Sequence, residues 1–279
     1  MTGTPFVTRF APSPTGFLHR GHAYSALTAF AAAQAARGHI LLRIEDLDRT
    51  RCRPEFVTAI HEDLTWIGMA WDQPARRQSD HLDAYAAALD SLKAKGLIYR
   101  CFKTRRDLES EIAGAPHGPM DAYRGAPLAT AEEARRVSAG EPYAWRLSLS
   151  AAERGLGRFH GLMFAVDGEG LVQARPDLGG DVVLARKDGA VAYHLACVVD
   201  DALQGITHVI RGADLAEAAH VQRLLQALLD LPTPVYRHHR LLTGPDGKRL
   251  AKRDRAETLR DLRARGMTAA ELRREMGFD

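Results

Sequence analysis

The sequence predicts an α/β fold in which a parallel sheet is built from two halves, with a small subdomain inserted between them. Strand and helix signals alternate through the first hundred residues, and the same alternation resumes after about residue 182. Between these regions, residues 101–180 are rich in glycine and proline, which indicates loops. Alternating strands and helices favour a parallel sheet covered by helices, and such sheets bind their ligands beyond the carboxyl ends of the strands.

The first half begins with a predicted strand over residues 5–10, followed by a turn at Pro12–Gly16. An alanine-rich stretch predicts a helix over residues 21–37, which we expect Gly38 to end with a left-handed cap. The apolar run 39–44 is typical of a buried strand.

Two further helices complete this half. Pro54 fits the first turn of a helix that carries Phe56, Ile60, Leu64 and Ile67 at helical spacing. Leucine and tyrosine side chains over residues 82–92 predict the next helix, ended by Gly96.

The second half contains predicted strands at 182–186 and 206–210, an apolar run at 191–199 and a helix over 215–229. We therefore expect four segments. They are the first half of the catalytic sheet (1–100), the inserted subdomain (101–181), the second half (182–255) and a short basic helical segment (256–279).

Composition excludes several classes of protein. The 279 residues are 46% hydrophobic and 26% charged, and they contain no apolar run that could span a bilayer and no signal-peptide pattern. Three widely spaced cysteines do not suggest a disulfide framework, so we expect a cytoplasmic protein. The net charge of +3 is small, but residues 248–275 carry ten Lys or Arg against five Asp or Glu, which could face phosphates or simply solvent.

Two clusters of residues have side chains suited to binding phosphate groups. His19-Arg20-Gly21-His22 stands at a predicted helix start, where imidazoles and unpaired N–H groups favour a phosphate, although histidine can also be a plain helix cap. The basic segment Lys248–Arg253 follows a Gly-Pro-Asp-Gly turn and could close on a triphosphate, although a basic loop is often only solvated surface.

Together the motifs resemble the class I glutamyl-tRNA synthetases. Arg9–Gly16 matches their RFAPSPTG opening, His19–His22 their HIGH motif and Arg249–Arg253 their KMSKS loop. The resemblance extends over roughly residues 6–255 and implies a split Rossmann-type sheet, the class I aminoacyl-tRNA synthetase catalytic core.

The chain departs from this family in its motifs, its length and its insertion. Only Lys252 keeps the family identity in the KMSKS loop, and Arg20 replaces an apolar residue in the HIGH motif. The chain ends 26 residues after Arg253, where glutamyl-tRNA synthetases continue into an anticodon-binding region, and so it resembles the shortened paralogues that attach glutamate to the queuosine base of tRNA(Asp).

The family's insertion often holds zinc through a Cys-x-Cys pair, a tyrosine and a later cysteine. Here Cys101 and Tyr123 are present, but Lys103 and Pro127 stand where the family pattern has the other two cysteines, so zinc is not expected.

The resemblance implies ATP-dependent activation of L-glutamate to glutamyl-adenylate, with Mg²⁺ accompanying ATP, and transfer of glutamate to RNA. It assigns His19, His22 and Lys252 to catalysis and, with Gly21, to ATP. Arginine pairs well with carboxylates, and the implied glutamate pocket consists of Arg9, Ala11, Ser13, Glu45, Tyr193 and Arg211. An ion pair of Arg43 with Glu45, and a core position for Tyr193, are structural alternatives.

Two other functions stay open at this point. The chain could be a minimal glutamyl-tRNA synthetase that charges the 3′ end of tRNA(Glu), or a pseudo-enzyme that binds nucleotide or RNA without catalysis. In the favoured interpretation the partners are L-glutamate, ATP and queuosine-containing tRNA(Asp), without a membrane, and the protein is a monomer.

Overall fold

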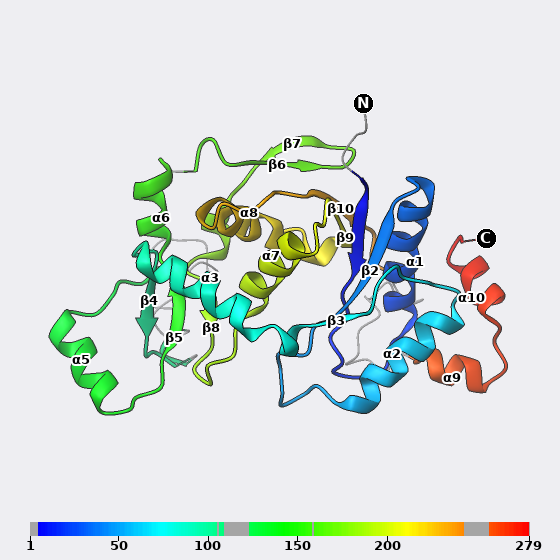
Figure 1. Cartoon of the computed structure of the whole chain (residues 1–279), viewed down its shortest axis with the longest axis horizontal. Helices are drawn as coiled ribbons and strands as arrows, with labels where there is room; N and C mark the ends of the chain where they lie inside the picture. Colours follow the sequence, from blue (N-terminus) through cyan, green and yellow to red (C-terminus); the bar gives the residue numbers. More distant parts are fainter. Residues whose placement is uncertain (1–4, 105, 109–122, 158, 243–256, 279) are drawn as a thin grey trace. The chain divides into compact units, whose positions relative to one another are not determined.

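The computed structural model describes residues 5–104, 106–108, 123–157, 159–242 and 257–278 (Figure 1). They form two compact units, one of residues 1–81, 205–216 and 234–279 and the other of residues 82–204 and 217–233. These units are groups of residues that contact one another, so they do not test the four segments expected from the sequence. The boundaries of those four segments remain a prediction. Among the described residues, no helix is long and apolar enough to cross a membrane.

The first unit contains the parallel sheet that the sequence predicts. Strand β1 (Val7–Phe10) pairs in parallel with β2 (His39–Ile44), and β2 pairs in parallel with the short β3 (Arg76–Arg77). On the other side, β9 (His208–Gly212) pairs in parallel with β10 (Val235–His239). The Thr207 backbone N–H donates to the Val7 carbonyl at 2.9 Å and so places β9 beside β1.

The resulting strand order is β3-β2-β1-β9-β10, so the chain leaves β1 toward one edge of the sheet and later fills the other side. A reversal of this kind creates a crevice at the carboxyl ends of the central strands, where ligands of doubly wound sheets bind. The fold therefore directs attention to the segments that follow β1, β2 and β9.

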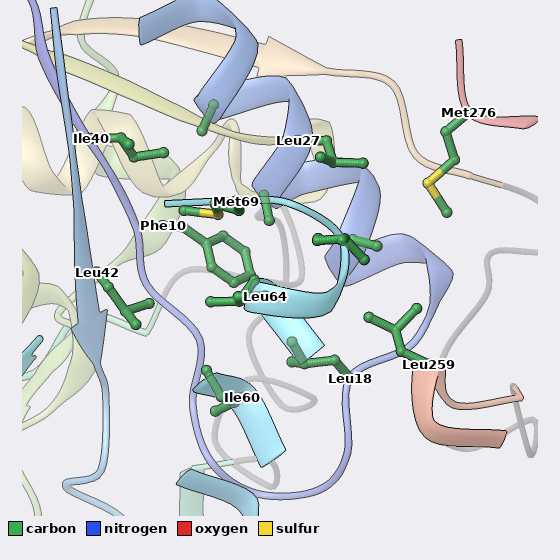
Figure 2. Packing of buried hydrophobic residues seen from close by; sticks show 14 of the residues in the cluster. Phe10, Leu18, Leu27, Ile40, Leu42, Ile60, Leu64, Met69, Leu259 and Met276 are labelled. Carbon is green, nitrogen blue, oxygen red and sulfur yellow. The ribbon is translucent and has the colours of Figure 1, made fainter. Parts of the chain in front are cut away.

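Helices and apolar side chains cover one face of this sheet. Helix α1 (Arg20–Ala35) and helix α2 (Pro54–Trp66) follow β1 and β2, and the short helices α9 (Leu259–Ala264) and α10 (Ala269–Glu275) close the chain. Figure 2 shows Phe10 and Leu42 from the strands packed with Leu27, Leu64 and Leu259 from the helices. The C-terminal helices thus belong to the core, which a solvated basic segment would not.

The end of α1 corrects one expectation. The left-handed residue is Arg37, with φ 50°, and Gly38 does not adopt a left-handed conformation. Gly38 is needed for another reason, because a Cβ atom there would lie 2.2 Å from the Phe6 carbonyl oxygen. The His39 N–H donates to that same carbonyl at 2.8 Å, which starts β2 beside β1.

The second unit contains helix α3 (Leu82–Ala94), which was expected, and an antiparallel sheet that was not. Strands β4 (Ile98–Cys101), β5 (Ala144–Leu147) and β8 (Val183–Ala185) form that sheet in the order β4-β5-β8. The described part of this unit also contains a hairpin of β6 (Met163–Val166) and β7 (Gly170–Gln173), and the α-helices α5 (Thr130–Ser138), α6 (Leu149–Leu156), α7 (Tyr193–Leu203) and α8 (Ala218–Leu228). The stretch expected to be mostly loop is therefore structured in much of its described part.

The carboxylate of Asp63 is buried in the first unit and is not among the predicted site residues. Asp63 of α2 is 1% exposed, and among the described residues none donates a hydrogen bond to its Oδ2. Burial raises the pKa of Asp63 to about 6, opposed in part by the positive charges of Arg263 and Arg260. The charged form is therefore disfavoured in the folded state.

We predict that Asp63→Asn stabilises the protein at pH 8 and has less effect at pH 5. The folded-state pKa lies above the unfolded value of about 3.9, so the folded chain binds more protons between about pH 4 and 6 and loses up to roughly 3 kcal/mol of stability as pH rises through that window. Urea unfolding of both proteins across this range measures the difference. A wild-type chain whose stability is flat from pH 4 to 7 would contradict the prediction.

Candidate functional site

The loop from β1 to α1 carries the predicted site residues Ala11, Ser13 and His19, and three backbone hydrogen bonds hold it in place. The Glu45 N–H donates to the Pro12 carbonyl at 3.0 Å and the Arg53 N–H to the Pro14 carbonyl at 3.1 Å. At its far end, the Leu259 N–H donates to the Leu18 carbonyl at 2.8 Å. Ala11 is partly exposed and Ser13 is exposed on this loop.

The two histidines of the HxGH motif form the N-terminal cap of α1. His19 is the N-cap residue, and its Nδ1 accepts from the Gly21 N–H at 3.1 Å. The His22 Nδ1 accepts from the His19 N–H at 3.2 Å, and the two ring centroids lie 3.9 Å apart. Because Nδ1 accepts in both rings, each neutral imidazole carries its proton on Nε2 and can donate from there.

The capping interpretation of these histidines is therefore correct, and it is compatible with phosphate binding. The cap fixes the tautomer and the orientation of both rings at the positive end of a 16-residue helix. Gly21 serves the same arrangement, since a Cβ atom there would lie 3.0 Å from the His19 ring.

Three buried arginines lie on the sheet face opposite to the hydrophobic cluster. Side chains alternate along a strand. Phe10 of β1 and Leu42 of β2 belong to the cluster, so Arg9 and Arg43 point to the other face. Arg211 follows the cluster residue Ile210 on β9 and points the same way.

These arginines are 4% (Arg9), 0% (Arg43) and 5% (Arg211) exposed. Three guanidinium groups in one place make this face of the sheet strongly positive, and a positive surface attracts anions. This face lies at the carboxyl halves of three neighbouring strands, where the strand order places the crevice.

Glu45 follows β2 directly, and its Oε1 lies 3.2 Å from the Arg43 Nη2. The ion pair weighed from the sequence is therefore present. It fixes one carboxylate oxygen next to the buried face, where a ligand ammonium group could approach the same carboxylate.

Arg211 is oriented by a residue that the sequence did not reveal. The Arg211 guanidinium carbon lies 5.3 Å from the centroid of the Tyr236 ring on β10. Tyr236 is 1% exposed and pairs in register with Val209, two residues before Arg211, so both side chains lie on the same face. The signal in the sequence for strand β10 is weak and consists of the β-branched Val235 followed by the aromatic Tyr236.

Two further predicted site residues, Tyr193 and Lys252, do not belong to the described part of the first unit. Tyr193 is the first residue of α7 in the second unit and is 37% exposed, so the core alternative for Tyr193 is wrong. Lys252 and the whole segment Arg249–Arg253 lie outside the described residues.

The acidic residues next to the motifs have structural roles. Asp46 accepts from Arg77 and from the backbone and hydroxyl of Ser79, which anchors the chain after β3. Asp200 accepts the Tyr85 hydroxyl at 2.9 Å inside the second unit.

The inserted sheet is held together around Asp181, which is 2% exposed. Its carboxylate accepts from the Tyr99 hydroxyl, the Gly125 N–H and the Leu149 N–H at 2.8–2.9 Å. Burial and the Asp181 charge raise the pKa of Tyr99, so the phenol stays protonated and donates.

The residues at the family's zinc position do not fit a zinc ion. The Lys103 ammonium lies 5.3 Å from the Tyr123 ring centroid, and the Arg146 guanidinium carbon lies 5.0 Å from the same centroid. Two cations around the tyrosine oppose a divalent metal, and within the described ranges no three His, Cys, Asp or Glu side chains gather as metal ligands.

Comparison with known proteins agrees with this geometry. The family of class I tRNA synthetases (E and Q), catalytic domain, matches residues 5–275, and the chain belongs to this family. The fold and the site thus define a class I aminoacyl-tRNA synthetase catalytic domain.

Individual relatives are more specific. The chain is 45% identical to the glutamyl-Q tRNA(Asp) synthetase of Rhodobacter capsulatus, over 98% of this chain and 100% of that protein. It is 42% identical to glutamate–tRNA ligase 2 of Dinoroseobacter shibae, over 93% of this chain but 58% of the ligase. A crystal structure of a glutamate tRNA ligase from Elizabethkingia meningosepticum in complex with its amino acid aligns with a TM-score of 0.73 at 27% identity, covering 94% of this chain and 53% of that one.

We predict that Tyr236→Leu raises the KM for glutamate about fivefold, because loss of a cation–π contact worth about 1 kcal/mol leaves Arg211 less well oriented. Glutamate-dependent exchange of pyrophosphate into ATP measures it. Tyr236→Phe keeps the aromatic face and should retain the wild-type KM, and the KM for ATP should be unchanged in both. Equal effects of Leu and Phe would contradict the assignment.

The second prediction for this site is that the purified protein holds no stoichiometric zinc and that a chelator leaves its Tm unchanged. Hydrogen bonds to Asp181 and the cations around Tyr123 stabilise the inserted subdomain without a metal. Asp181→Ala removes these hydrogen bonds and should therefore lower the Tm by several degrees. Elemental analysis that finds about one zinc per chain would overturn this prediction.

Proposed function

We propose that this protein activates L-glutamate with ATP and transfers the glutamate to the queuosine base of tRNA(Asp). The observation that carries the proposal is the match, over the whole of the Rhodobacter capsulatus relative, to a protein named glutamyl-Q tRNA(Asp) synthetase. Relatives with the same name in Symbiobacterium thermophilum and Nocardia farcinica are 41% and 42% identical over more than nine-tenths of this chain.

The buried arginine face supports glutamate as the substrate. Glutamate carries two carboxylates and one ammonium group. Arg9 and Arg211 receive carboxylate oxygens, for which the planar guanidinium is well suited, and Glu45 receives the ammonium. Ala11 and Ser13 on the β1–α1 loop also take part in glutamate binding in this proposal, and the family resemblance assigns Tyr193 to the same substrate.

The histidine cap supports ATP as the second substrate. In the reaction, the glutamate α-carboxylate attacks the α-phosphorus of ATP, the bond to the bridging oxygen breaks and pyrophosphate leaves with that electron pair. His19 and His22 donate from Nε2 to phosphate oxygens at the N-terminus of α1, where Gly21 lets them approach. Lys252 stabilises the charge on the leaving pyrophosphate, and Mg²⁺ enters with ATP.

In the second step a hydroxyl of the queuosine base attacks the carbonyl of glutamyl-adenylate, and AMP leaves. Neither step requires a strong acid or base, so positioning and charge stabilisation carry the catalysis. A monomer acting in the cytoplasm is part of this proposal.

A second candidate function comes from the relatives named glutamate–tRNA ligase, such as the Dinoroseobacter shibae protein. A chain of that activity would charge the 3′ end of tRNA(Glu). The pseudo-enzyme alternative would bind nucleotide or RNA without forming glutamyl-adenylate.

We predict that the protein exchanges pyrophosphate into ATP in the presence of glutamate without tRNA, and then labels only tRNA(Asp) that contains queuosine. The test supplies radiolabelled glutamate with tRNA(Asp) from cells able or unable to make queuosine, and with tRNA(Glu). Equal labelling of both tRNA(Asp) samples, or efficient charging of tRNA(Glu), favours the second candidate. Absence of exchange favours the pseudo-enzyme.

A further inference from the structure

The short loop between β2 and α2 is unusually basic. Residues 47–53 contain Arg49, Arg51 and Arg53 against one acidic residue, Asp48. Arg51 is neutralised, because its Nε donates to the Asp48 Oδ2 at 2.6 Å. Arg49 and Arg53 are exposed, and within the described part of the chain neither forms an ion pair with a carboxylate.

This loop is held in a fixed shape. The Asp48 Oδ1 accepts from the Thr50 N–H at 3.1 Å and from the Thr50 hydroxyl at 2.6 Å, and these bonds with Arg51 lower the pKa of Asp48 far below its usual value. The Arg53 N–H binds the Pro14 carbonyl, so the arginines are tied to the loop that carries Ser13. Two exposed cations on a rigid loop lose little conformational freedom when an anion binds.

A third arginine lies next to the far end of the same β1–α1 loop. Arg260, in the first turn of α9, is exposed, and its guanidinium carbon lies 5.3 Å from the Phe17 ring centroid. Phe17 contacts Phe56 of α2 edge to face at 5.0 Å, which links this segment back to the helix that Arg53 caps. The bond from Leu259 to Leu18 fixes Arg260 beside the loop.

The segments next to the β1–α1 loop therefore carry exposed arginines that form no ion pair with a carboxylate of the described chain. An anion with several phosphates spaced along a backbone fits this arrangement better than one compact anion, because the segment of Arg49 and Arg53 is attached to the loop at Pro14 and that of Arg260 at Leu18. Cations arranged along a surface in this way are the usual electrostatic footprint of a nucleic acid.

We infer that Arg49, Arg53 and Arg260 bind the phosphates of the tRNA next to the reacting nucleotide. The assignment rests on the proposed function, in which an RNA base must reach the residues of the β1–α1 loop. Backbone contacts of this kind would orient the RNA without reading its sequence, which leaves recognition of the base to the pocket itself.

The experiment compares the full-length wild type with Arg49→Ala/Arg53→Ala, and with a control that removes the same charge elsewhere, Arg37→Ala/Arg154→Ala. Arg37 and Arg154 are exposed and lie outside the segments next to the β1–α1 loop. The Kd for tRNA(Asp) is measured between about 50 and 200 mM salt, and glutamate-dependent pyrophosphate exchange is measured in parallel.

The Arg49/Arg53 variant should show a salt dependence of log Kd that is shallower by about 1.4, since each contact to single-stranded RNA contributes about 0.7. Its KM for tRNA in the transfer reaction should rise at least about fivefold, while exchange, the KM for ATP and the Tm stay at wild-type values. Arg49→Lys/Arg53→Lys keeps the charge and should retain most of the salt dependence. Arg260→Ala should lower the slope independently.

A salt dependence equal to that of the control pair would overturn the inference, and so would a higher KM for ATP, which would assign the arginines to the nucleotide. Failure of the proposed function gives a different result. In that case the wild type itself would not transfer glutamate to queuosine-containing tRNA(Asp), whereas the binding comparison would still report on the arginines.

Discussion

The arrangement of the first unit depends on how the β1–α1 loop is fixed. Three carbonyls of this loop, at Pro12, Pro14 and Leu18, accept N–H groups from the β2–α2 connection and from the start of α9, which lie far from the loop in the chain. A buried backbone carbonyl without a partner would be costly, so these bonds both satisfy the loop and determine its path. The histidine cap, the end of β2 and the docking of α9 all follow from that path.

The sheet below the loop has two chemically different faces. One face is an ordinary hydrophobic core, and the other carries three arginines that are almost completely buried. Burying several guanidinium groups opposes folding unless hydrogen bonds and charges compensate. Arg43 contacts Glu45, and Arg211 lies over the Tyr236 ring. The charges are held in place before any ligand arrives, which reduces the reorganisation that binding would otherwise require.

The inserted subdomain is stabilised in a different way, by hydrogen bonds to a buried carboxylate. Its sheet is organised by one buried carboxylate, Asp181, which receives hydrogen bonds from Tyr99 and from two backbone N–H groups. Lys103 and Arg146 lie around Tyr123, where relatives with a zinc site would need ligands. Because each donor is used by a group that is itself buried or packed, hydrogen bonding and cation–π contacts can maintain the geometry that a metal would impose.

The sequence by itself determined the first three elements closely, because strong local signals coincide there. The strand predicted at 39–44 is β2, and Pro54 begins α2 as expected. The motif residues Arg9, His19, Glu45 and Arg211 could be identified because they lie in segments that resemble the motifs of the glutamyl-tRNA synthetases. Only the tertiary structure decided which residues support them. Tyr236 lies in a short strand with no periodic signal of its own, and Asp181 acts through partners 32 to 82 residues away in the chain. Such contacts depend on how strands pair across the sheet, and local patterns in a sequence do not record that pairing.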